Sequence, residues 1–139
     1  MAIDYEKERR EAIAAGTEAL ISLRSAQSEL REAGSWGIWD ILGGGLLVTI
    51  AKQKRMKDAR NSLDHARAKL RYFEKELQDL DRLDHINLDT GDFLGFADVF
   101  FDGLFADLAM QDRIGTARDK VSMAIRRVEE ILAQLHRQA

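Results

Sequence analysis

The 139-residue sequence contains no cysteine and no proline. The absence of cysteine excludes disulfides, thiolate metal sites and cysteine nucleophiles. The absence of proline fits long uninterrupted helices, because proline is the strongest breaker of a helix interior. The first ten residues also lack the apolar stretch that a secretory signal needs. We therefore expect a cytoplasmic protein, and the length indicates a single domain with one modest core.

The composition, with 45% hydrophobic and 32% charged residues, is typical of long solvated helices rather than of a disordered or membrane-embedded chain. The net charge of −3 conceals a strong segregation of charge. Residues 52–71 hold eight basic side chains against two acids, and residues 76–112 hold ten acids against one arginine. Such an acidic block repels phosphate, which argues against a nucleic acid as the partner.

The chain resembles itself at an offset of 58 residues. Residues 35–73 align without a gap on residues 93–131, and ten of the 39 pairs are identical, among them Asp40/Asp98 and Arg60/Arg118. Ordinary residue frequencies give about two or three such pairs. We interpret the two segments as a duplicated unit, in which an apolar, glycine-containing entry is followed by a long helix. The alternative is a coincidence between two amphipathic helices of the same phase.

Apolar residues recur at alternating spacings of three and four in both copies, a period of 3.5 that predicts a left-handed bundle seam. The first copy contributes Met56, Ala59, Leu63, Ala66, Leu70, Phe73, Leu77 and Leu80, and the second Ile114, Ala117, Val121, Ala124, Val128, Ile131 and Leu135. Because each seam contains two alanines, we expect the two helices to approach closely and to pack antiparallel.

The predicted fold is an elongated, all-α, antiparallel three-helix bundle of the coiled-coil type. The first helix covers about residues 4–33, has an apolar stripe at Ile13, Leu20, Leu23 and Leu30, and is Ala-rich on its other face. A Gly-rich turn at 34–45 follows, since Gly34 and Ser35 are a good helix stop. The second helix covers about 46–81, an acidic connection 82–92, and the aromatic entry with the third helix about 93–137.

Two aromatic, apolar entries interrupt the simple bundle pattern. One contains Trp36 and Trp39 before three glycines, and the other contains five of the six phenylalanines, including Phe100 and Phe101. Asp40 and the glycines argue against a transmembrane helix. The entries either pack on each other as an end-cap core below the glycine turn, or form an exposed interface for a second copy or a lipid surface.

Two strings in these entries, residues 35–45 (SWGIWDILGGG) and 96–104 (FADVFFDGL), are similar to strings shared by a group of uncharacterised helical bacterial proteins. The resemblance implies a bacterial helical protein. It implies no activity, because none is known for the group, and it assigns no catalytic or binding residue.

Candidate chemical sites are few. Asp98 and Asp102 lie one helical turn apart and could share a hard cation or one proton, although a solvated face or a helix cap is the favoured explanation. His65, His85 and His136 lie in separate segments, and none neighbours a recognisable catalytic string. Gly43–Gly45 lacks the Gly-Lys-Ser/Thr ending of a phosphate loop. We therefore expect a non-enzyme without a cofactor.

The basic residues Lys52, Lys54 and Arg55 directly follow the first apolar entry. Their complement is either the acidic entry of the second copy, within the chain or between subunits, or an anionic membrane, or an acidic protein. We expect a structural or protein-interaction module that forms homo-oligomers. The alternatives are a peripheral membrane-surface protein, or a small-ligand or cation binder at the Phe/Asp cluster. The expected interaction surface comprises Trp36, Trp39, Lys52, Lys54, Arg55, Phe100 and Phe101.

Overall fold

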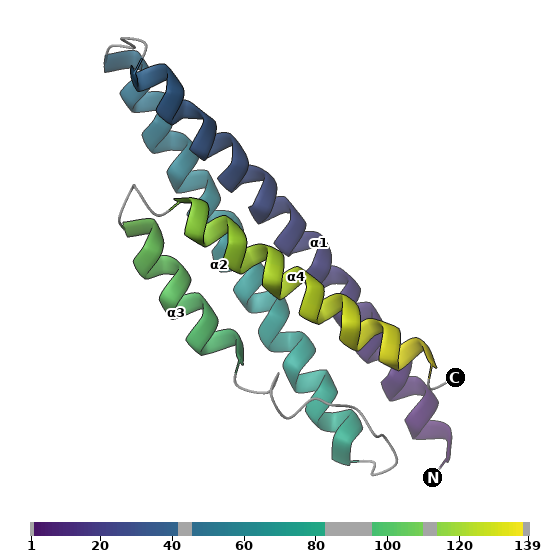
Figure 1. Cartoon of the computed structure of the whole chain (residues 1–139). Helices are drawn as coiled ribbons and strands as arrows, with labels where there is room; N and C mark the ends of the chain where they lie inside the picture. Colours follow the sequence, from purple (N-terminus) through teal and green to yellow (C-terminus); the bar gives the residue numbers. More distant parts are fainter. Residues whose placement is uncertain (1, 42–45, 83–95, 110–113, 138–139) are drawn as a thin grey trace.

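In the part of the chain that it describes, the computed structural model consists of four α-helices and contains no strands (Figure 1). The backbone is described for residues 2–41, 46–82, 96–109 and 114–137, and side chains are described for residues 5–32, 53–54, 56–80, 98–108 and 114–137. The predicted all-α class is confirmed, but there are four helices where the sequence predicted three.

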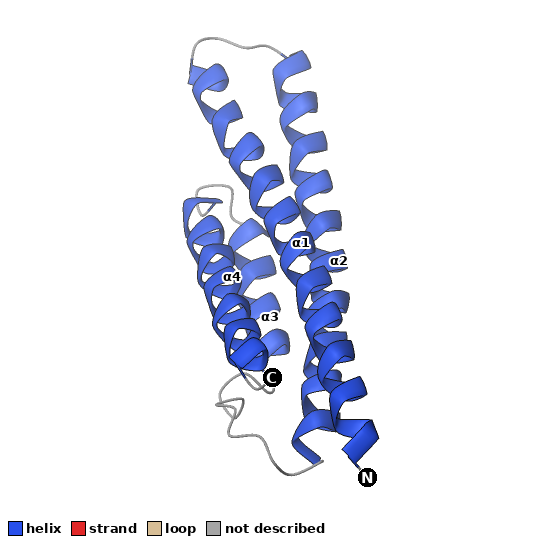
Figure 2. Ribbon diagram, turned by 90° about the vertical axis from the view of Figure 1, so that its right-hand side faces the viewer, coloured by secondary structure: helices blue, strands red, loops and turns tan. Residues whose placement is uncertain are grey.

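The helices form two antiparallel hairpins. The long hairpin consists of α1 (Ala2–Ile41) and α2 (Leu46–Arg82), and the short one of α3 (Phe96–Ala109) and α4 (Ile114–Arg137). Figure 2 shows the short hairpin lying along one side of the long one. Helix α1 packs against α2 and α4, and α3 packs against the same two helices. The four helices therefore enclose one core, with α2 and α4 on a diagonal.

The core contains every stripe residue predicted for α2 from Ala59 to Leu80 and for α4 from Ile114 to Leu135, each no more than 8% exposed. This confirms the 3.5-residue period as the signal for the buried faces of these two helices. Met56, the first residue predicted for the α2 stripe, is only partly buried against the core. Phe101, Leu104 and Leu108 of α3 complete the core from the remaining side.

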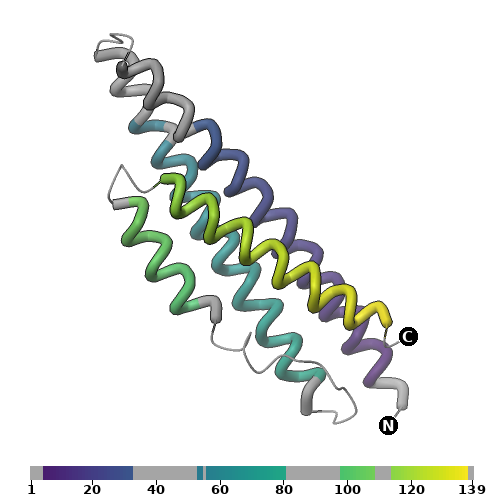
Figure 3. The backbone as a smooth tube through the Cα atoms, in the orientation of Figure 1, coloured from purple at the N-terminus to yellow at the C-terminus, as the bar shows by residue number. Residues whose placement is uncertain are grey.

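The predicted contact between the two repeat helices is not found. Among the described residues, no Cα atom of α2 lies within 8 Å of a Cα atom of α4, so their alanines do not pack on each other. The two helices also run parallel rather than antiparallel, as the colour gradient of Figure 3 shows. The cause is α3, which was expected to be a short entry continuous with the third helix. As a separate helix it reverses the chain direction before α4.

The face that α1 buries is its Ala-rich one. Ala12, Ala15, Ala19 and Ala26 are at most 2% exposed, together with Leu23 and Leu30, whereas Ile13 and Leu20 of the predicted stripe are only partly buried. Helix α1 is the neighbour of both α2 and α4, and small side chains let its axis approach both of them. The close approach that we expected between the repeat helices is thus made by α1.

Gly16 lies at the tightest point of this packing. A Cβ atom built on Gly16 would lie 2.7 Å from Leu132 Cδ2 and 2.7 Å from Phe73 Cε1. Leu132 belongs to α4 and Phe73 to α2, so three helices meet at this glycine. Nearby, Arg9 of α1 donates a hydrogen bond of 2.9 Å to the carbonyl oxygen of Leu135, near the end of α4. This bond satisfies a terminal carbonyl that has no partner within the helix.

Helix α1 does not end at Gly34 as predicted but continues to Ile41. Each of the two glycines in this extension, Gly34 and Gly37, costs about 1 kcal/mol in a helix interior, which neighbouring residues of ordinary helix propensity can offset. Without a proline, nothing in residues 34–41 forces the helix to stop. The predicted glycine turn is therefore shorter, and its remaining residues, 42–45, lie outside the described part of the chain.

Candidate functional site

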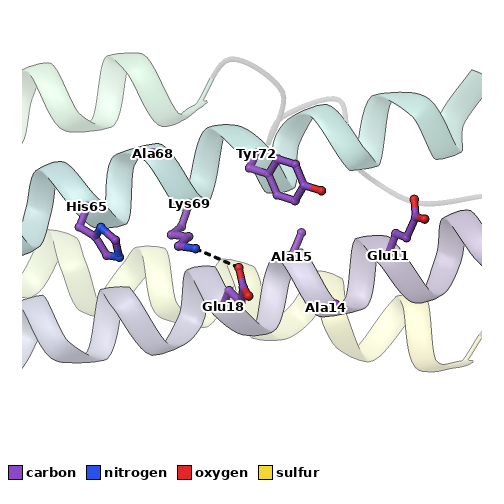
Figure 4. Close-up of a pocket in the computed structure, with 8 residues that line it drawn as sticks. All are labelled: Glu11, Ala14, Ala15, Glu18, His65, Ala68, Lys69 and Tyr72. Atoms are coloured by element: carbon purple, nitrogen blue, oxygen red, sulfur yellow. Dashed lines mark hydrogen bonds and ion pairs between the residues drawn. The ribbon is translucent and has the colours of Figure 1, made fainter.

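An open groove runs along the interface of α1 and α2, with a volume of about 610 Å³ (Figure 4). Glu18 of α1 and Lys69 of α2 form an ion pair of 3.1 Å across it. His65 and Glu11 lie towards opposite ends of the groove, with Tyr72 between them. A second groove continues beyond His65 and is lined by Ile21, Ser22, Ser25, Asn61 and Ser62.

Three carboxylates meet close to the Glu11 end of the groove. Glu8 of α1 and Glu76 and Asp79 of α2 each place one carboxylate oxygen within 4.8 Å of the other two. Glu76 and Asp79 share a helix face because they are three residues apart. The antiparallel register that pairs Glu18 with Lys69 also brings Glu8 opposite Asp79. We refer to Glu8, Glu76 and Asp79 as the carboxylate cluster.

Glu76 is the buried member of the carboxylate cluster, with 7% of the residue exposed. It accepts a hydrogen bond from the hydroxyl of Tyr72, one helical turn earlier on α2. Its Oε2 atom is buried and has no hydrogen-bond partner. Burying a carboxylate oxygen without a partner costs free energy, so a hydrogen-bond donor or a cation at this atom would stabilise it.

The electrostatics of the carboxylate cluster follow from its crowding. Partial burial raises the pKa of Glu8, and the negative charges of Glu11, Glu76 and Asp79 raise it further. The hydrogen bond to Glu76, followed by the negative charge of that carboxylate, raises the pKa of Tyr72. Tyr72 therefore remains a protonated donor to Glu76 at neutral pH.

Asp98 and Asp102, the candidate cation ligands in the sequence, instead face arginines of α2. Arg71 donates to Asp98 Oδ1 from Nε at 2.9 Å and from Nη2 at 2.6 Å. Arg67 Nη2 lies 3.7 Å from Asp98 and 3.8 Å from Asp102. The positive charge that a cation would supply is therefore provided by the chain itself, and the two aspartates tie α3 to α2. Both arginines belong to the basic block 52–71, so part of that block is complemented within the chain.

Asp98→Asn is expected to lower the midpoint of thermal unfolding slightly at pH 7, because it removes the charge that pairs with Arg71. The Arg71 hydrogen bonds lower the pKa of Asp98 from its ordinary value of 3.8. A lowered pKa stabilises the fold above that value, and the contribution disappears as the pH falls through the pKa of the folded state. The difference in the midpoint of thermal unfolding between the variant and the wild type should hence decrease below pH 3.8. An equal difference at pH 7 and at about pH 2 would contradict the charge-based assignment.

The residues expected to form an interaction surface differ in their exposure, and some lie outside the described part of the chain. The side chains of Trp36, Trp39, Lys52 and Arg55 lie outside the described residues, and Lys54 is exposed. Phe100 is half-buried, and Phe101 is fully buried in the core. The assignment of Phe101 to a surface is therefore wrong, because α3 is a core-forming helix and Phe101 lies on its inner face. The ring of Phe100 packs edge-on against Phe101 at 4.9 Å.

The carboxylate cluster was missed in the sequence because Glu8 is about 70 residues away from Glu76 and Asp79. The only local signal is the spacing of Tyr72, Glu76 and Asp79, which places all three on one face of α2. Asp107, a further acid of α3, is 5% exposed and accepts a hydrogen bond of 2.5 Å from Lys120 of α4. That ion pair joins the two helices of the short hairpin.

Comparison of the chain with protein-family models, with curated proteins and with solved structures finds no significant match. None of the helices in the described ranges carries an apolar stretch that could span a bilayer.

Proposed function

We propose that the chain is a non-catalytic helical module that self-associates through the end of its long hairpin. The observation that carries this proposal is the difference in length between the two hairpins. Helix α1 has 40 residues and α2 has 37, whereas α3 has 14 and α4 has 24. The short hairpin can therefore accompany only part of the long one.

Contacts between the hairpins show which end of the long hairpin the short hairpin does not cover. Arg60 of α2 lies over the ring of Phe105 at 5.9 Å, and α3 ends one turn later, at Ala109. Helix α2 begins at Leu46, so about ten of its residues precede the level at which α3 ends. At 1.5 Å per residue this two-helix end is about 15 Å long.

The sequence of the two-helix end is too apolar for a hairpin alone. An apolar residue stands at each of positions 36, 38, 39, 41, 46, 47, 48 and 50. Successive helix positions are about 100° apart, so the four positions of α1 are distributed around that helix instead of forming one stripe, and position 48 lies outside the stripe formed by positions 46, 47 and 50 of α2. Two paired helices cover one stripe each. The remaining apolar positions favour a partner outside the chain, and a second copy offers an identical surface.

The internal repeat also belongs to this proposal. Positions 59, 63, 66, 70, 73 and 77 of α2 are buried, and so are the residues 58 positions later in α4. The shared burial pattern supports a duplicated, coiled-coil-like helix, although the segments preceding the two helices differ in structure. The bacterial origin, the cytoplasmic location and the resemblance to the bacterial helical group stay predictions from the sequence.

The double variant Trp36→Ser/Trp39→Ser tests the proposal. Because large aromatic residues contribute most of the binding energy in interfaces, we expect at least a tenfold rise in the dissociation constant of the oligomer. Light scattering at a series of protein concentrations measures the molar mass and hence this constant. The matched control is Ile21→Ser/Met123→Ser, which removes two apolar side chains, 62% and 56% exposed, from the four-helix section. It should leave the constant unchanged.

A monomeric wild type at all concentrations would contradict self-association. The peripheral membrane alternative then has its own test, flotation with anionic liposomes. Loss of flotation in Lys52→Glu/Lys54→Glu/Arg55→Glu, with flotation retained after charge reversal of the exposed Arg10, Lys75 and Arg126, would replace our proposal with a membrane function.

A further inference from the structure

The carboxylate cluster has two independent features that indicate a ligand. Three carboxylate oxygens, from Glu8, Glu76 and Asp79, converge within 4.8 Å of one another. In addition, Glu76 is more than nine-tenths buried, and its Oε2 atom has no hydrogen-bond partner although its other bond, to Tyr72, is made. We propose that Glu8, Glu76 and Asp79 bind a hard divalent cation that joins α1 to α2.

A single proton compensates the negative charge of the carboxylate cluster less completely than a divalent cation does. One proton can bridge only two of the three carboxylates and leaves the third facing their negative charge. A divalent cation compensates most of the charge of all three and can bind the free oxygen of Glu76 directly. The cluster also lies close to the C-terminal end of α2, which ends at Arg82. The partial negative charge of a helix C-terminus favours a cation there.

The donor set indicates the class of cation. All three residues offer carboxylate oxygens, which are the ligands preferred by Ca²⁺, Mg²⁺ and Mn²⁺, whereas Zn²⁺ sites are built mainly from His and Cys. Two oxygens bound to Ca²⁺ at about 2.4 Å are at most about 4.8 Å apart. The observed convergence within 4.8 Å is thus compatible with one ion bound to all three residues. Water would complete the coordination on the exposed side.

The position of the carboxylate cluster suggests what the cation does. Residues 42–45 connect α1 to α2 at one end of the long hairpin. Glu8 and Asp79 lie at the opposite end, where no short connection joins these two helices. A cation bound there fixes the open end of the hairpin. This role does not depend on the self-association proposed above, because that proposal concerns the end of the hairpin beyond α3.

The first experiment measures binding of Ca²⁺, Mn²⁺ and Mg²⁺ to the full, chelator-treated chain by isothermal titration calorimetry. We expect one ion per chain and a rise of the dissociation constant by at least tenfold in Glu76→Gln and in Asp79→Asn. A cation that binds only the folded state should raise the midpoint of thermal unfolding by about 5 to 10 °C at 100 times its dissociation constant. The control Asp64→Asn removes an exposed acid from the same helix and should bind as the wild type does.

A second experiment locates the ion. Bound Mn²⁺ should broaden the backbone amide resonances of residues around Glu8, Glu76 and Asp79 and spare those around Asp64 and Asp98. If Glu76→Gln fails to fold, Glu8→Gln at a half-buried position of α1 replaces it in both experiments. Absence of binding by the folded wild type, unchanged affinity in the cluster variants, or broadening centred on other acids would each overturn the proposal.

Discussion

Leu70→Ala is expected to lower the free energy of unfolding by about 2 to 5 kcal/mol, because it removes a buried side chain and leaves a cavity. Leu70 is 0% exposed in the middle of the α2 stripe. Its neighbours along that stripe, Ala66 and Phe73, are also fully buried, so the site lies within the packed core. Denaturant unfolding followed by circular dichroism measures the change.

Met123→Ala is the matched control for this substitution. Met123 of α4 is 56% exposed, and substitutions at such positions usually change the free energy of unfolding by no more than about 0.5 kcal/mol. A loss below about 1 kcal/mol for Leu70→Ala would mean that the α2 stripe does not face a packed core.

The buried faces of α2 and α4 could be predicted from the sequence because they depend on a local property. A strict alternation of three- and four-residue spacings leaves only one face of a helix apolar, whatever that helix packs against. The first residues of the two stripes, Met56 and Ile114, show the limit of this rule. Met56 is only partly buried, because α2 passes the end of α3 near that point, and Ile114, the first residue of α4, is 8% exposed.

The arrangement of the helices could not be predicted in the same way. Nothing local distinguishes a helix that begins at Phe96 and ends at Ala109 from an entry that leads into the next helix, since both are rich in apolar residues. The prediction for α1 has a similar origin, since Leu23 and Leu30 of its stripe are buried but Ile13 and Leu20 are only partly buried. Leucine and isoleucine indicate a buried stripe in isolation, but contact with two neighbouring helices also buries the alanines beside that stripe.

The acidic residues illustrate the same distinction between local sequence patterns and tertiary packing. Asp98 and Asp102 were correctly recognised as a pair one helical turn apart, but their partners, Arg67 and Arg71, are known only once α3 is packed on α2. The carboxylate cluster can be recognised only when it is known which residues of α1 and α2 lie opposite each other at the end of the hairpin. A local pattern identifies which side chains share a face, and only tertiary packing shows what lies opposite that face.

Gly16→Val is expected to lower the free energy of unfolding by about 1 to 3 kcal/mol, because it inserts a side chain into a packed interface. The first added carbon would already lie 2.7 Å from atoms of both Phe73 and Leu132. Phe73 is fully buried, so its ring cannot move aside into solvent. Valine has a better helix propensity than glycine, and a net loss would therefore show that the packing term is the larger one.

Gly115→Val provides the control for this change, because a Cβ atom at Gly115 of α4 meets no atom within 4 Å. We expect its free energy of unfolding to stay within about 0.5 kcal/mol of the wild type. The double variant Gly16→Val/Phe73→Leu should recover part of the loss, since the smaller leucine vacates the space that the Phe73 ring occupies. A Gly16→Val protein as stable as the wild type would show that α1, α2 and α4 do not meet at this residue.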